Sequence, residues 1–241
     1  MTQEFIHKIL EAHGGLKRWN QLKKLNVTIV SGGKLFSLIN QPQDATPRLL
    51  EVRLHEQSLS MTPYGGPDKK TNFSPNRIAI ETLDGKELSA RIGSIEELHN
   101  HMKADGWDAL DRAYFNGYAN WTYLVTPFFL ALPDIKVEGI KSWKQDNEIW
   151  QGIRVTFPEN IATHCPTQDF YFGEDYLLRR HDYLVDVAGE FNATQYLSDY
   201  TEVNGIKLPT KRRAYIKQAD GFPSADDLMV HIDYTDIRFS L

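Results

Sequence analysis

The chain has 241 residues, of which 41% are hydrophobic, and a formal net charge of −5 with both signs interspersed. This length and apolar content suffice for one large domain with its own core. No long run of Lys or Arg is present, which excludes a nucleic-acid partner. The single cysteine, Cys165, excludes an internal disulfide framework and a multi-cysteine zinc site.

The N-terminal sequence predicts a helix over residues 3–12 that is closed by Gly14-Gly15, since glycine accepts the left-handed conformation of a helix end. The segment lacks the basic start and apolar run of a secretory signal. No stretch reaches the ~18 apolar residues needed to cross a bilayer. We therefore expect a cytoplasmic protein without an integral membrane segment.

Two long regions predict an antiparallel meander of strands. The first covers residues 25–92 and contains short alternating runs separated by turn residues, at 27–29, 35–39, 50–54, 58–62 and 78–82. The second follows residue 135, with strands expected over 136–143, 149–157, 168–172, 176–186, 193–203, 206–217 and 228–239.

Residues 94–132 predict a helical insert within this sheet. Ser94 and Glu97 have the spacing of a capping box, and apolar side chains then recur every three or four residues. Asp105-Gly106 divides the insert into two helices. The chain as a whole (residues 1–241) therefore predicts a single mainly β (α+β) domain: a curved antiparallel sheet of about ten strands, or half-barrel, with helices covering its concave face.

This order of elements resembles the lipoprotein-carrier (LolA/LppX-like) fold across nearly the whole chain, ending in the strand sequence G-I-K-L-P-T-K. The resemblance implies a curved sheet with a helix-covered concave side. The N-terminus lacks the signal of periplasmic carriers, so a lipoprotein-shuttling role does not carry over. Separately, the sequences RRHDY at 179–183 and PTKRR at 209–213 resemble the signature of an uncharacterised bacterial protein family, which implies a family and no particular activity.

The most informative segment is QDFYFGEDYLLRRHDYLVD, residues 168–186, which predicts two strands joined by a turn. Strict alternation puts Arg179 and His181 on one face together with Tyr183. A polar pair among apolar side chains is typical of a pocket wall. We expect Arg179 and His181 to point into the concave side of the sheet, towards Trp107, Tyr114 or Trp121.

Four arginines on two strands have two possible roles. Arg179, Arg180, Arg212 and Arg213 could form cross-strand ion pairs, each contributing ~0.2–1 kcal/mol when exposed. Alternatively, one of them could anchor a ligand carboxylate or phosphate at the end of an apolar cavity, and Arg179 is favoured because of its apolar face-mates. The aromatic residues of the insert likewise suit either a core or a cavity lining.

A metal site would have to use residues such as His164, His181, His231, Asp169 and Asp233, but their spacing matches no known metal motif. We expect no metal and no cofactor. His164 next to Cys165 does not predict a nucleophile–base pair, because adjacent residues on extended backbone point apart.

The sequence therefore predicts a binding protein for a small apolar or amphipathic ligand held between the sheet and the helical insert. The predicted contacts are Arg179, His181, Tyr183, Trp107, Tyr114, Trp121 and His231. One alternative is an enzyme that uses His181 as a base oriented by Asp233. Another is a structural or interaction module whose concave face is filled by its own side chains. The oligomeric state is left open.

Overall fold

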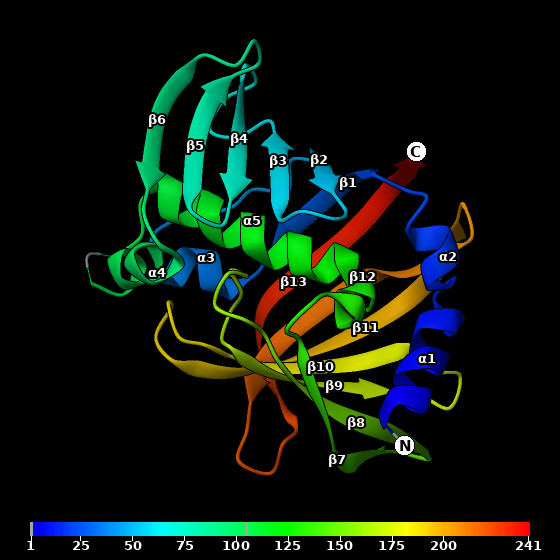
Figure 1. Ribbon diagram of the computed structural model, residues 1–241. Coiled ribbons are helices and arrows are strands. Elements are labelled where there is room, and N and C mark those ends of the chain that lie inside the picture. Colours follow the sequence, from blue (N-terminus) through cyan, green and yellow to red (C-terminus); the bar gives the residue numbers. More distant parts are fainter. Residues whose placement is uncertain (1, 105) are drawn as a thin grey trace.

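The computed structural model describes residues 2–104 and 106–241. Its thirteen strands form one sheet with the order β6-β5-β4-β3-β2-β1-β13-β12-β11-β10-β9-β8-β7 (Figure 1). All neighbouring strands are antiparallel. The strands are β1 (Lys24–Gly32), β2 (Arg48–Arg53), β3 (Ser58–Thr62), β4 (Lys69–Ser74), β5 (Arg77–Thr82), β6 (Glu87–Ile92), β7 (Lys136–Gln145), β8 (Glu148–Thr156), β9 (Thr167–Phe172), β10 (Leu178–Val185), β11 (Phe191–Val203), β12 (Ile206–Lys217) and β13 (Pro223–Ser240).

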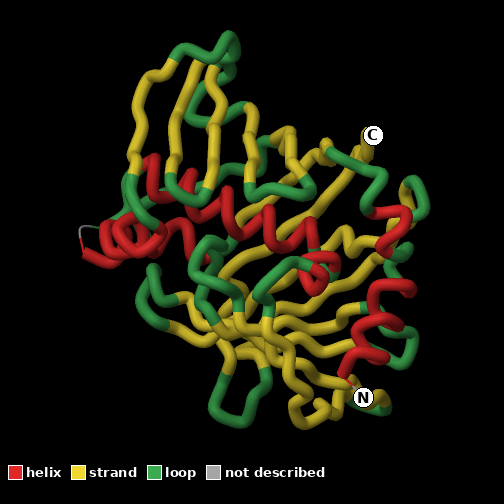
Figure 2. Tube along the Cα trace, in the orientation of Figure 1, coloured by secondary structure: helices red, strands yellow, loops and turns green. Residues whose placement is uncertain are grey.

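The helical insert connects the two open edges of the sheet. β6 and β7 are the edge strands, and the chain between them contains α4 (Ile95–Ala104), α5 (Ala109–Val125) and the 3-10 helix η1 (Phe128–Ala131). To join opposite edges of an open, curved sheet, the insert crosses the concave face (Figures 1 and 2). The predicted architecture is confirmed, with thirteen strands where about ten were expected.

Side-chain caps fix the starts of both helices of the insert. The Ser94 hydroxyl accepts from the backbone N–H of Glu97 at 3.2 Å, and the Glu97 carboxylate accepts from the N–H of Ser94 at 2.7 Å, so the predicted capping box is present. Asp108 caps α5 by accepting from the backbone N–H groups of Leu110 and Asp111. Asp105 of the predicted break lies outside the described residues.

Helix α5 is buried on all sides, which is typical of a core helix rather than a surface helix. One side faces β3, β4 and β5, and the other faces β10 to β13. Gly117 allows the close approach to β4, because a Cβ atom at this position would lie 2.3 Å from the ring of Phe73. The aromatic residues of α5 therefore belong to the central hydrophobic core.

The remaining helices lie at the rim of the sheet. α1 (Thr2–Ala12) and α2 (Leu16–Trp19) stand beside the lower strands in Figure 1. The expected strand over 35–39 is wrong: this segment is the helix α3 (Lys34–Leu38). Its adjacent residues Leu35 and Phe36 are both buried, a pattern that a half-buried strand cannot produce. Within the described ranges, none of the helices has the length and apolar character that crossing a membrane requires.

Candidate functional site

A small apolar cavity lies between α5 and the strands β10 to β13. Its volume of about 20 Å³ has room for about one water molecule. One side of α5 forms its roof, and inward-facing side chains of β10 to β13, with Ser31 of β1, form its floor. The lining residues are Ser31, Leu35, Phe36, Phe115, Asn116, Ala119, Asn120, Tyr123, Tyr183, Val185, Phe191, Ala193, Ala214, Met229, Val230 and Ile232.

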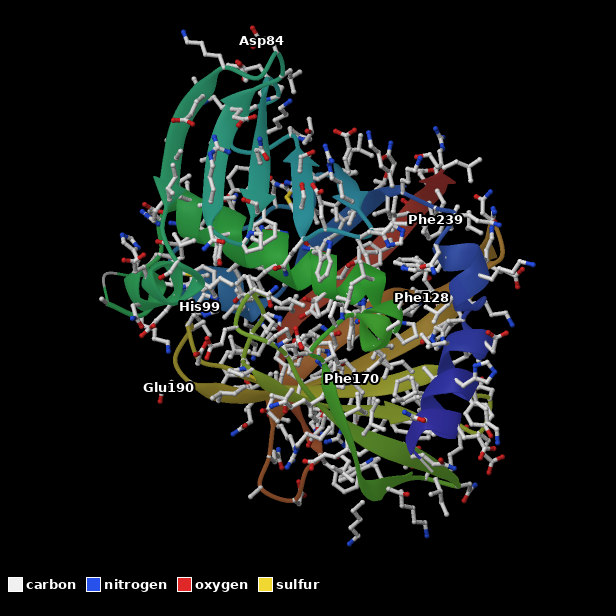
Figure 3. All side chains as sticks on the ribbon, viewed as in Figure 1. Asp84, His99, Phe128, Phe170, Glu190 and Phe239 are labelled. Atoms are coloured by element: carbon white, nitrogen blue, oxygen red, sulfur yellow. The ribbon has the colours of Figure 1, made fainter. Side chains whose placement is uncertain are left out.

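The rim of the cavity is formed by short, partly exposed elements. Phe36 comes from α3, Phe191 is the half-buried first residue of β11, and Val230 is half-buried within β13. Glu190 marks the tip of the neighbouring β10–β11 hairpin in Figure 3. The rim therefore lies between α3 and this hairpin, whereas the opposite end of the cavity meets the interior of the protein.

Next to Tyr123 of the cavity wall lies the buried guanidinium of Arg212, which does not itself line the cavity. Its side chain is 2% exposed, and it donates to Gln195 Oε1 at 2.8 Å and to the carbonyl of Tyr123 at 2.6 Å. The guanidinium also lies over the Tyr123 ring at 4.6 Å. Among the described residues Arg212 makes no ion pair with a carboxylate, and its Nε has no hydrogen-bond partner. Burial lowers the pKa of Arg212, because removal from water disfavours the charged form.

The contact with Tyr123 explains how a lone cation is tolerated here. Tyr123 lies in the last turn of α5, where backbone carbonyls have no partner within the helix. A cation at this end also interacts favourably with the helix dipole. Arg212 therefore fixes the C-terminal end of α5 to the sheet, with neutral groups as its partners.

A chain of hydrogen bonds runs from Arg212 to His164. Arginine can only donate, so Gln195 accepts through Oε1 and donates through Nε2 to the Tyr183 hydroxyl, at 3.4 Å. Tyr183 and Tyr123 contact each other at 3.0 Å, and Tyr123 contacts His164 Nε2 at 2.7 Å. Burial raises the pKa of both phenols, so each keeps one proton to donate. Both phenolic protons are used when Tyr183 donates to Tyr123 and Tyr123 donates to His164, and His164 Nδ1 then has no partner among the described residues.

Two buried histidines of this site therefore have opposite tautomers. Burial lowers the pKa of His164 to about 3 and that of His181 well below its usual range, so both rings are neutral. His164 accepts at Nε2 and thus carries its proton on Nδ1. His181 Nε2 lies 2.6 Å from Gln168 Oε1, and Gln168 donates through its nitrogen to the carbonyl of Cys165. His181 therefore donates from Nε2.

We expect nitrogen-15 NMR of the imidazole rings at neutral pH to show the Nδ1–H form for His164 and the Nε2–H form for His181. The replacement Tyr123→Phe removes the donor to His164 and should alter the ring-nitrogen shifts of His164 more than those of His181. The same tautomer for both rings would contradict the direction of the hydrogen-bond chain.

Arg179 does not point into the concave side, and that expectation is wrong. A β-bulge between Leu178 and Arg180, where β10 pairs with β9, breaks the strict alternation. His181 stays on the concave face, where it stacks on Phe170 at 4.2 Å, whereas Arg179 turns outwards to Asp175 at 2.6 Å. Figure 3 shows Phe170 in the interior of the molecule.

His231 and Asp233 lie on the convex face, because their neighbour Ile232 on β13 faces the cavity. Asp233 pairs with Arg213 at 2.7 Å. His231 lies over Gly32, where a Cβ atom would be 2.7 Å from the His231 ring. The predicted pairing of His181 with Asp233 is therefore wrong, since the sheet separates them.

The predicted aromatic contacts are divided between cavity and core. Tyr183 lines the cavity. Trp107, Tyr114 and Trp121 face other parts of the core, and their polar atoms donate to the backbone carbonyls of Val187, Pro75, and both Arg53 and Glu56, respectively. The prediction that these residues bind a ligand stays a prediction. Within residues 2–104 and 106–241, His, Cys, Asp and Glu form no cluster that could hold a metal.

The sequence interpretation missed Gln195 and the central position of Arg212. For Arg212, the pattern of β12 contains a signal. On β12 the alternate positions Ile206, Leu208, Ala214 and Ile216 are apolar, and Arg212 falls in the same row. A charged residue in an apolar register indicates a buried functional or structural group.

The open, curved sheet and its helix-filled concave face form a LolA-like half-barrel fold. Three solved structures share this fold over nearly their whole length. A LolA superfamily protein from Nitrosomonas europaea has a TM-score of 0.52 and 11% sequence identity, and the match covers 97% of this chain and 92% of that one. A domain described as an outer membrane lipoprotein-sorting protein from Vibrio parahaemolyticus has a TM-score of 0.52 and 10% identity, with 98% of this chain and 91% of that one covered. A DUF1329 family protein from Desulfovibrio piger has a TM-score of 0.51 and 9% identity, with 99% of this chain and 93% of that one covered.

At such low identity the likeness establishes the fold. No family model matches the chain, and no curated protein matches it.

Proposed function

We propose that the protein binds a small hydrophobic or amphipathic molecule between α5 and the strands β10 to β13. The observation that carries this proposal is the apolar cavity between helix and sheet, with polar groups confined to a few positions of its wall. The fold supports it: one solved structure of the same architecture is described as a lipoprotein-sorting protein, and such a protein handles chains that carry lipid.

Binding requires the cavity to widen. A volume of about 20 Å³ holds about one water molecule and no alkyl chain, so the ligand replaces contacts that the side chains now make with one another. Widening the cavity at its rim costs the least free energy, because the helix there, α3, has only five residues and follows Gly32 and Gly33. We propose that α3 moves away from the β10–β11 hairpin and that the ligand enters there. The expected cytoplasmic location stays a prediction.

A cavity-filling replacement tests the position of the ligand. Ala119 lies on the cavity side of α5, so Ala119→Leu puts a larger side chain into the space that the ligand would occupy. We expect this variant to bind a neutral apolar fluorophore, N-phenyl-1-naphthylamine, about tenfold or more weakly than the native protein, a loss of roughly 1.4 kcal/mol. Fluorescence titration measures it, and circular dichroism verifies the fold.

The matched control is Gly139→Leu. Gly139 lies in an open groove formed by α1, β7 and β8, where a Cβ atom would meet nothing within 4 Å. This variant should bind the fluorophore as the native protein does. Equal binding by all three proteins, or a loss confined to Gly139→Leu, would place the ligand outside the cavity.

A further inference from the structure

The buried cation Arg212 indicates the chemistry of the ligand. Its side chain is 2% exposed, and both of its hydrogen-bond acceptors are neutral oxygens. A buried charge is costly unless an opposite charge accompanies it. The other two buried arginines follow this rule: Arg180 pairs with Asp182 at 2.6 Å on the convex face, and Arg48 pairs with Asp44 at 2.7 Å. Arg212 therefore has one positive charge for which the described part of the chain supplies no counter-ion.

Arg212 also adjoins the cavity. Its guanidinium packs against Tyr123, and its partner Gln195 contacts Tyr183; both tyrosines line the cavity wall. The acceptor on Nη1 is the neutral Gln195 amide oxygen, at 2.8 Å, and Nε has no partner among the residues described. A ligand oxygen that arrives from the cavity can take the place of the amide oxygen without breaking the bond to α5.

We infer that the ligand is a monoanionic amphiphile whose carboxylate pairs with Arg212 while its apolar chain occupies the cavity beneath α5. This inference rests on the proposed ligand-binding function. A guanidinium matches the planar geometry of a carboxylate and binds it through charge-assisted hydrogen bonds. The groups around Arg212 that influence its charge are the phenols of Tyr234, Tyr123, Tyr200 and Tyr183, so a single cation faces the ligand and one negative charge suffices to balance it.

The test compares two ligands with the same alkyl chain, one charged and one neutral: dodecanoic acid, at a pH at which it is ionised, and methyl dodecanoate. Their dissociation constants are measured by displacement of N-phenyl-1-naphthylamine from the native protein. We expect the acid to bind about 10- to 100-fold more tightly than the ester, the range of a hydrogen bond to a charged group. This comparison needs no variant.

Two variants then assign the preference to Arg212. Arg212→Gln keeps hydrogen-bond donors but removes the charge, and it should weaken binding of the acid by about 10- to 100-fold while leaving the ester unchanged. Arg213→Gln is the matched control, because its side chain lies on the opposite face and pairs with Asp233. It should retain the preference for the acid.

Three results would overturn the inference. Equal binding of acid and ester by the native protein would leave the ligand-binding function standing and exclude the carboxylate. A preference that persists in Arg212→Gln, or that disappears in Arg213→Gln, would place the anion elsewhere. If neither compound displaces the fluorophore, and Ala119→Leu binds the fluorophore as the native protein does, the proposed function itself fails.

Discussion

Acidification from pH 7 to pH 5 is expected to lower the free energy of unfolding by about 6 kcal/mol, through three buried histidines that contribute about 2 kcal/mol each. Burial lowers the pKa of His164 to about 3, that of His13 to about 4 and that of His181 well below its usual range. Between these values and the unfolded value of about 6.5, the unfolded chain binds protons that the folded protein does not. Stability is therefore highest above about pH 6.5 and falls as the pH decreases.

Urea unfolding at pH 7 and at pH 5 measures this loss. His164→Phe keeps an aromatic ring against Tyr183, on which His164 stacks at 4.4 Å, and removes one titrating group. The difference between the two pH values should become smaller by about 2 kcal/mol in this variant. A free energy of unfolding that is the same at both pH values would show that the histidines are not buried in their neutral form.

Asp182→Asn is expected to lower the free energy of unfolding by about 3–5 kcal/mol, since it leaves the buried Arg180 without its counter-ion. Asp182 is 4% exposed and accepts from Arg180 at 2.6 Å, from Lys217 at 2.7 Å and from Thr194 at 2.7 Å. Arg180 lies under the ring of Trp143 at 4.0 Å, so the cluster also attaches edge strand β7 to the sheet.

Asp233→Asn is the matched control on the same convex face. Asp233 also pairs with an arginine, Arg213 at 2.7 Å, but the side chains of Arg213 and Asp233 are 29% and 38% exposed. An exposed pair of this kind contributes at most about 1 kcal/mol. Urea unfolding of both variants gives the comparison. Equal losses would show that the Arg180–Asp182 pair is accessible to water.

The sequence was sufficient for the overall architecture because the longer elements have strong local signals. The period of the apolar residues changes from two to about three and a half at Ser94 and returns after residue 132, which separates the insert from the strands. The strand expected over 35–39 was wrong because a run of five residues is too short to distinguish the two periods, and burial of both Leu35 and Phe36 against the sheet determines its helical form.

The site could be predicted only in part, because a single bulge changes which side chain faces inwards. Arg179 would share the face of His181 in a regular strand, but the extra residue at this position of β10 turns it towards Asp175. Arg212 lies beside the apolar cavity, and β12 alternates regularly around it, from Lys211 to Tyr215. The large rings of α5 were harder to assign, since a helix buried on all sides presents aromatic residues to the core and to the cavity alike.

The central claim is the position of the ligand beneath α5, and photocrosslinking tests it most directly. Dodecanoic acid that carries a diazirine on its alkyl chain is bound to the native protein and irradiated, and the labelled peptides are identified by mass spectrometry. We expect label on Phe115, Ala119 and Ala193, which line the cavity. Label on Phe5, Ile140 and Ile149, which line the open groove between α1 and strands β7 and β8, would contradict the claim.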